Sequence, residues 1–172
     1  MGAVEFTSIL SRFPSSPLWG WYFLVPTNIA LPFVQGNDRR VVCIINDQLK
    51  LHCALMPNKD TWFIMINQGV QKKLKTPLGS EINISLIKDI SEYGMPMPDE
   101  LREVLDQDAE ADTYFHKLTP GKQRSLIYIV NKVKSTDSKI RKSLAIADHL
   151  TANKGKLDGK LLYEALKEYN KM

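Results

Sequence analysis

A cluster of cationic side chains is the feature of this sequence best suited to binding chemistry. The cluster lies on both sides of Ser135, Thr136 and Asp137, and its members are Lys132, Lys134, Lys139, Arg141 and Lys142. Polar residues of this kind separate helices, so we expect the cations on two consecutive helices. Helix pairs with a short turn deliver such cations to phosphate groups. The candidate anion- or partner-binding residues are therefore Lys134, Lys139, Arg141 and Lys142.

Other interpretations of these cations stay open. The second helix of the pair lacks the Asn and Gln side chains that read bases, so nucleic-acid binding is only a second alternative. The cations also have the composition of a solvated helix face. In a third interpretation they face an acidic helix of the same chain, with Asp137 capping their own helix.

The residue patterns of common enzymes are missing from the sequence. Its three histidines, His52, His116 and His149, are scattered and form no metal-ligand motif with Cys, Asp or Glu. Gly155 and Gly159 lack the spacing of a phosphate-binding loop, and no serine has the context of a nucleophile elbow. The sequence therefore predicts no catalytic residue, no metal and no cofactor. It favours binding over catalysis and leaves enzymatic activity open.

An aromatic cluster near the N-terminus supports the main alternative, a small-molecule site. Trp19, Trp21 and Phe23 would share one face of a strand, with Tyr22 on the other. Such side chains either pack in a core or line a ligand pocket. Core packing is favoured, but Trp19, Trp21 and His52 remain the candidate pocket of a barrel that binds a small molecule. Whether such a barrel would also catalyse a reaction stays open.

Charge is distributed unevenly along the 172 residues, whose formal net charge is +4. Residues 96–116 contain seven acidic side chains against Arg102 alone, whereas residues 117–172 contain thirteen basic and five acidic side chains. No apolar run has the roughly 20 residues of a membrane helix, and the N-terminus lacks a signal-peptide pattern. We expect a cytoplasmic protein that does not insert into membranes.

The first half of the chain has the pattern of β-strands. Short segments rich in β-branched and aromatic residues alternate with Pro, Gly, Asn and Asp. They are residues 4–9, 20–25, 40–45, 49–55, 61–66 and 81–87. Six such strands suggest a closed barrel or a sandwich. Residues 26–33 and 68–74 are predicted as short helical insertions.

One hairpin of this half allows a prediction of register. A turn at Asn46 and Asp47 would place Lys50 opposite Cys43, so that Cys43 and Cys53 lie on opposite faces. Both cysteines should then be reduced. The predicted core face contains Val42, Ile44, Leu49, Leu51 and Cys53.

The second half has the 3.6-residue period of helices. It follows a Pro- and Gly-rich linker, residues 94–98, that neither a strand nor a helix tolerates. Pro98 and Asp99 open a first helix, and Thr119 and Pro120 cap a second. A third helix would bury Ile140, Leu144, Ala147 and Leu150, and a fourth would follow Gly155. The predicted organisation is a barrel over residues 1–93 and a helical bundle over residues 99–172.

Both halves resemble known families. Pro98 to Leu101, the acidic turns, Phe115, Leu118 to Pro120 and the basic helix pair resemble the C-terminal domain of the YdeI/OmpD-associated, or bacteriocin-protection, family. Residues 21–26, 40–47, 55–57, 62–64 and 79–84 resemble domain of unknown function 1905, a six-stranded Greek-key barrel. The family pattern has arginines where this chain has Lys139 and Lys142, which would weaken a bidentate anion site.

Together these features predict an α+β protein with an N-terminal six-stranded Greek-key-like β-barrel and a small C-terminal helical bundle. The resemblance implies a bacterial protein linked to envelope stress or bacteriocin protection. The expected activity is non-catalytic binding of an unknown protein or anionic partner.

Overall fold

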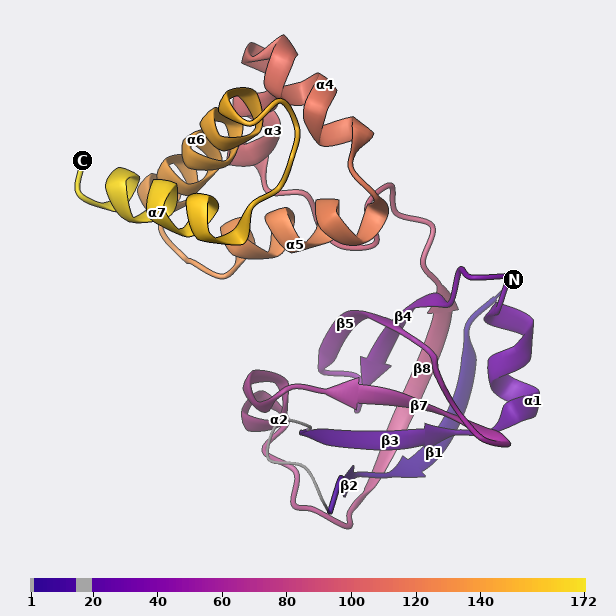
Figure 1. Cartoon of the computed structure of the whole chain (residues 1–172). Helices are drawn as coiled ribbons and strands as arrows, with labels where there is room; N and C mark the ends of the chain where they lie inside the picture. Colours follow the sequence, from indigo (N-terminus) through magenta and orange to yellow (C-terminus); the bar gives the residue numbers. More distant parts are fainter. Residues whose placement is uncertain (1, 15–19) are drawn as a thin grey trace. The chain divides into compact units, whose positions relative to one another are not determined.

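The computed structural model describes residues 2–14 and 20–172, and its chain divides into two compact units, residues 1–90 and 91–172 (Figure 1). The first unit consists of antiparallel strands with short helices, and the second unit is helical. The predicted α+β class, with its helices mostly in the C-terminal half, is confirmed.

The strands of the first unit form two four-stranded antiparallel sheets, with strand orders β1-β8-β4-β5 and β2-β3-β7-β6. The first sheet contains β1 (Val4–Ile9), β8 (Glu81–Lys88), β4 (Arg40–Ile45) and β5 (Leu49–Ala54). The second sheet contains β2 (Ser11–Arg12), β3 (Trp21–Val25), β7 (Thr61–Ile66) and β6 (Met56–Asn58). The short helices are α1 (Thr27–Ala30), a 3-10 turn (Leu31–Phe33) and α2 (Gln68–Leu74).

The predicted six-stranded barrel is not confirmed, because the strand pairing within the described residues does not close into one cylinder. The chain instead passes from one sheet to the other at Leu10, between β1 and β2, and at Leu55, between β5 and β6. Both leucines are fully buried. Such corners are typical of packed sheets whose strands switch from one sheet to the other.

The β4–β5 hairpin shows a register one residue away from the predicted one. Cys43 lies opposite Leu51, because the connection contains Gln48 in addition to Asn46 and Asp47. The inward face of β4 is consequently Val41, Cys43 and Ile45, and the prediction of Val42 and Ile44 was wrong. Leu49, Leu51 and Cys53 of β5 do pack against the core as predicted.

The same shift changes the environment of the cysteines. Cys43 and Cys53 share the inward face, so their predicted separation onto opposite faces was wrong, although both thiols are free. Hydrogen bonding to Cys53 and burial both raise the pKa of the Cys43 thiol well above its ordinary value. The Cys43 thiol therefore stays protonated, and both cysteines form part of the apolar core.

The second unit contains five helices among the described residues: α3 (Asp99–Gln107), α4 (Ala109–Lys117), α5 (Pro120–Asn131), α6 (Thr136–Ala152) and α7 (Gly159–Asn170). Their starts follow from local capping. Thr119 caps α5, as predicted, by accepting the Lys122 N–H. Ser135 caps α6, so the suggestion that Asp137 does so was wrong.

The core of this unit lies around α6. Phe115, Leu126, Ile127, Val130 and Ile146 are almost completely buried together with Leu101 and Leu150. Of the apolar stripe predicted for α6, Ala147 and Leu150 are buried, but Ile140 and Leu144 are 40% and 39% exposed. The exposed half of this stripe therefore belongs to the surface.

Candidate functional site

A groove with a basic rim lies between the ends of α5, α6 and α7. Its three lysines are Lys132, which directly follows α5, Lys142 of α6 and Lys167 of α7, and the groove has a volume of about 340 Å³. We call it the basic groove. Its floor contains Ile129 and Leu166, which pack against the core of the second unit. The groove combines an apolar floor with a cationic rim.

Two tyrosines complete the basic groove. Tyr128 and Tyr163 line it and are 54% and 62% exposed. The Lys167 ammonium lies 5.5 Å from the centroid of the Tyr163 ring, a cation–π distance. Within the described residues, no carboxylate forms an ion pair with the three groove lysines. Their charges are available to a ligand.

Two contacts hold α7 against α6 beside this groove. Arg141 donates from Nη1 to the Asn170 carbonyl oxygen at 3.2 Å, and its Nε lies 2.9 Å from the Asp137 carboxylate. The Tyr169 hydroxyl donates to the Asp148 carboxylate, and this hydrogen bond raises the pKa of Tyr169 to about 12. Both contacts join α6 to α7, the two helices that supply Lys142 and Lys167.

The four basic residues singled out by the sequence have different positions. Lys142 lines the basic groove, and Arg141 is engaged with Asp137 and Asn170. Lys134 is exposed in the turn before α6, and Lys139 is partly buried in the first turn of that helix. Sequence reasoning missed Tyr128, Tyr163 and Lys167. The i,i+4 spacing of Tyr163 and Lys167 was the available signal.

Of the three residues predicted to form a pocket in the first unit, the structure describes Trp21 and His52. Trp19 lies outside the described residues. Trp21 packs against the apolar core. His52 places Nδ1 2.8 Å from Oδ2 of Asp89, whose side chain is 1% exposed. Trp21 thus contributes to the core, and His52 forms a hydrogen bond with the buried Asp89 carboxylate.

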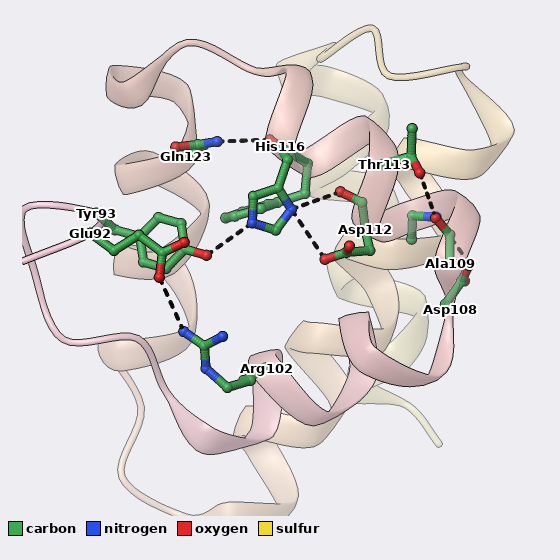
Figure 2. Close-up of polar contacts among 11 residues, drawn as sticks. Glu92, Tyr93, Arg102, Asp108, Ala109, Asp112, Thr113, His116 and Gln123 are labelled. Atoms are coloured by element: carbon green, nitrogen blue, oxygen red, sulfur yellow. Dashed lines mark hydrogen bonds and ion pairs between the residues drawn. The ribbon is translucent and has the colours of Figure 1, made fainter.

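A second set of polar contacts connects the segment before α3 to α4 (Figure 2). His116 lies between Tyr93 and Asp112: its Nε2 is 2.9 Å from the Tyr93 hydroxyl, and its Nδ1 is 3.1 Å from Asp112 Oδ1. Burial raises the pKa of Tyr93, which makes its hydroxyl a weak nucleophile. The Tyr93 ring also packs edge-on against Phe115. The arrangement anchors the segment before α3 to α4.

The described part of the chain contains no group of three or more His, Cys, Asp or Glu side chains that could hold a metal ion. None of its helices combines the length and the apolar composition that crossing a membrane requires.

Comparison with known proteins bears on the helical unit. Residues 94–153 match the family model described as "Bacteriocin-protection, YdeI or OmpD-Associated". The matched segment runs from the start of the linker through α6 and does not include α7. At family level the match suggests a function associated with bacteriocin protection. No curated protein matches the chain.

Proposed function

We propose that the protein is a non-catalytic binding module whose basic groove holds an acidic, partly apolar segment of a partner protein. The observation that supports this proposal most strongly is the convergence of Lys132, Lys142 and Lys167 around an apolar floor. Carboxylates of a bound segment would meet the lysines at the rim, while its apolar side chains cover Ile129 and Leu166.

The proposal extends to the organisation of the chain. Residues 1–93 would be a barrel-type domain related to domain of unknown function 1905, residues 94–98 a linker and residues 99–172 the binding domain. Such a protein would act in the bacterial cytoplasm, in a process linked to envelope stress or bacteriocin protection.

Two helical peptides of about 16 residues test the basic groove. They share leucines at helical spacing and differ only in flanking residues, which are glutamates in an acidic peptide and lysines in a basic peptide. The full-length chain should bind the acidic peptide in a fluorescence anisotropy titration. Changing Lys132, Lys142 and Lys167 together to Gln should weaken that binding at least tenfold, or about 1.4 kcal/mol.

A matched control changes Lys117, Lys122 and Lys160 to Gln, because these exposed lysines lie outside the groove. It removes the same net charge and should leave the dissociation constant within about twofold. Equal losses in the two triple variants would mean that net charge alone attracts the peptide, which contradicts a specific groove.

Nucleic acid is a second candidate ligand, favoured by the exposure of Tyr128 and Tyr163, on which bases can stack. A single-stranded oligonucleotide should then bind with a steep salt dependence, and Tyr128→Ala should weaken it. Absent or salt-independent binding would remove this candidate.

A further inference from the structure

A second groove lies between α3 and α6, and its charged side chains are acidic instead of basic. Val104, Ile140 and Leu144 supply apolar side chains, while Asp99, Glu100 and Glu103 supply carboxylates. The groove has a volume of about 570 Å³, larger than the 340 Å³ of the basic groove. We call it the acidic groove. It belongs entirely to the second unit and lies within the segment that matches the family model.

The apolar side chains of the acidic groove are arranged along the helix axis. Thr136, Ile140 and Leu144 follow each other at intervals of four residues and form one edge of α6. From Thr136 to Leu144 this edge extends for roughly 12 Å, or about two helical turns. Ile140 and Leu144 are large apolar side chains that the core of the unit leaves about two-fifths exposed. An edge of this length fits a short helical segment.

The acidic side of the groove is not neutralised within the described residues. Arg102 is the one basic residue of α3, and it lies 3.9 Å from Glu92 and over the ring of Tyr93 instead of in the groove. Glu103 accepts a hydrogen bond from Gln107, which leaves its charge intact. Among the described side chains, no lysine or arginine forms an ion pair with Asp99, Glu100 or Glu103. A ligand here needs apolar anchors and positive charges.

We propose that the acidic groove binds a cationic amphipathic helix of a partner polypeptide. Two or three apolar side chains of that helix, at i, i+3 or i+4 and i+7, would lie against Val104, Ile140 and Leu144. Its Lys or Arg residues would face the α3 carboxylates, where opposite charges raise the rate and the specificity of association. This proposal does not depend on the basic groove, which favours ligands of the opposite charge.

The basic and acidic peptides described above test the acidic groove directly. The full-length chain should bind the basic peptide with a dissociation constant below about 100 μM. Changing Ile140 and Leu144 together to Ala should weaken this binding at least tenfold and leave the acidic peptide unaffected. Leu161→Ala is the matched control, because Leu161 is 45% exposed on α7 and does not line the groove.

The contribution of the rim is separable from that of the floor. Changing Glu100 and Glu103 together to Gln should lower the affinity for the basic peptide severalfold. The loss should be smaller at high salt. Asp106→Asn removes an acid of the same helix that does not line the groove, and it should change nothing. Circular dichroism would verify that every variant remains helical.

Three outcomes would overturn the proposal. The first is an undiminished affinity of the Ile140/Leu144 variant for the basic peptide, and the second is equal binding of the two peptides to this groove. The third is a dimer of the unliganded protein in sedimentation that the Ile140/Leu144 variant abolishes, since the groove would then be covered by a second copy of the chain. Loss of acidic-peptide binding alone would contradict only the function proposed for the basic groove.

Discussion

The two grooves of the helical unit differ in charge but share a wall. Both have apolar side chains at their base, yet lysines surround one and carboxylates the other. Helix α6 contributes Ile140 and Leu144 to the acidic groove and Lys142 to the basic groove. One helix therefore presents surfaces of different chemistry in different directions.

This difference arises from the order of charges along the chain. Acidic residues concentrate in residues 96–116, which include α3, and basic residues follow in residues 117–172, which include α5 to α7. Net charge is a poor guide to the ligands of such a protein, because the formal +4 averages over two opposite surfaces. Variants that disturb α6 should affect both grooves, whereas the groove variants above should affect only one.

The largest expected effect is a loss of stability of the helical unit, which carries both grooves, in the variant Gly155→Ala. Gly155 has a φ of +80°, and a Cβ there would lie 2.8 Å from the Tyr114 ring on α4. Its N–H also donates to the Leu150 carbonyl at the end of α6. The strained backbone and the clash should together lower the free energy of unfolding of the helical unit by about 2 kcal/mol. Chemical denaturation followed by circular dichroism measures this loss.

Gly121→Ala is the control for that experiment. Gly121 lies in the first turn of α5, and a Cβ there would meet nothing within 4 Å. Alanine is the better helix former, so this variant should be unchanged or more stable by up to about 1 kcal/mol. A similar loss in both variants would contradict the role given to Gly155.

A smaller effect is expected from Ser135→Ala at the start of α6. The Ser135 hydroxyl oxygen accepts the Ser138 N–H at 3.1 Å, and losing such a cap costs about 1 kcal/mol. Thermal unfolding should show a lower midpoint, and the affinities of both peptides should fall together if the start of α6 frays. Ser135→Asp keeps a hydrogen-bond acceptor at this position and should keep the unfolding midpoint and the peptide affinities near those of the unchanged chain. Losses as large as those of Ser135→Ala would exclude capping as the cause.

The sequence predicted the helices better than the β-hairpin for a physical reason. Helix starts depend on local signals such as Thr119 and Pro120, and these were correctly placed. Hairpin register depends on one residue in the connection. Gln48 shifts the pairing by one and reverses the face of β4, although the strands themselves were predicted correctly. The transfer of the chain between sheets at Leu10 and Leu55 involves pairings distant in sequence, which periodicity does not indicate.

The grooves were harder to predict because they combine residues from several helices. Lys142 was singled out within a run of cations, but its neighbours Tyr163 and Lys167 come from α7. The stripe containing Ile140 and Leu144 was assigned to the core, because apolar periodicity cannot distinguish a buried face from a surface groove. Only the packing of α3 beside α6 decides which part of the stripe stays exposed.

The smallest effect expected concerns pH, through a histidine near the end of α6. His149 is buried, and its Nε2 accepts the Asp158 N–H at 3.2 Å at the start of α7. Burial lowers the pKa of His149 below its ordinary value of 6.5, a shift partly opposed by the charge of Asp158. The folded unit therefore prefers the neutral imidazole.

The direction of the pH effect follows from this preference. Above about pH 7.5, one unit above its ordinary pKa, the histidine is neutral in both folded and unfolded chains and adds no pH dependence. As the pH falls below that value, the unfolded chain gains a proton first, so the free energy of unfolding decreases until the lower pKa of the folded state is reached. The melting temperature should therefore drop between about pH 7.5 and pH 5. His149→Gln cannot gain this proton and should show a smaller drop, with the two peptide affinities changing in parallel. An identical drop in the variant would contradict the role given to His149.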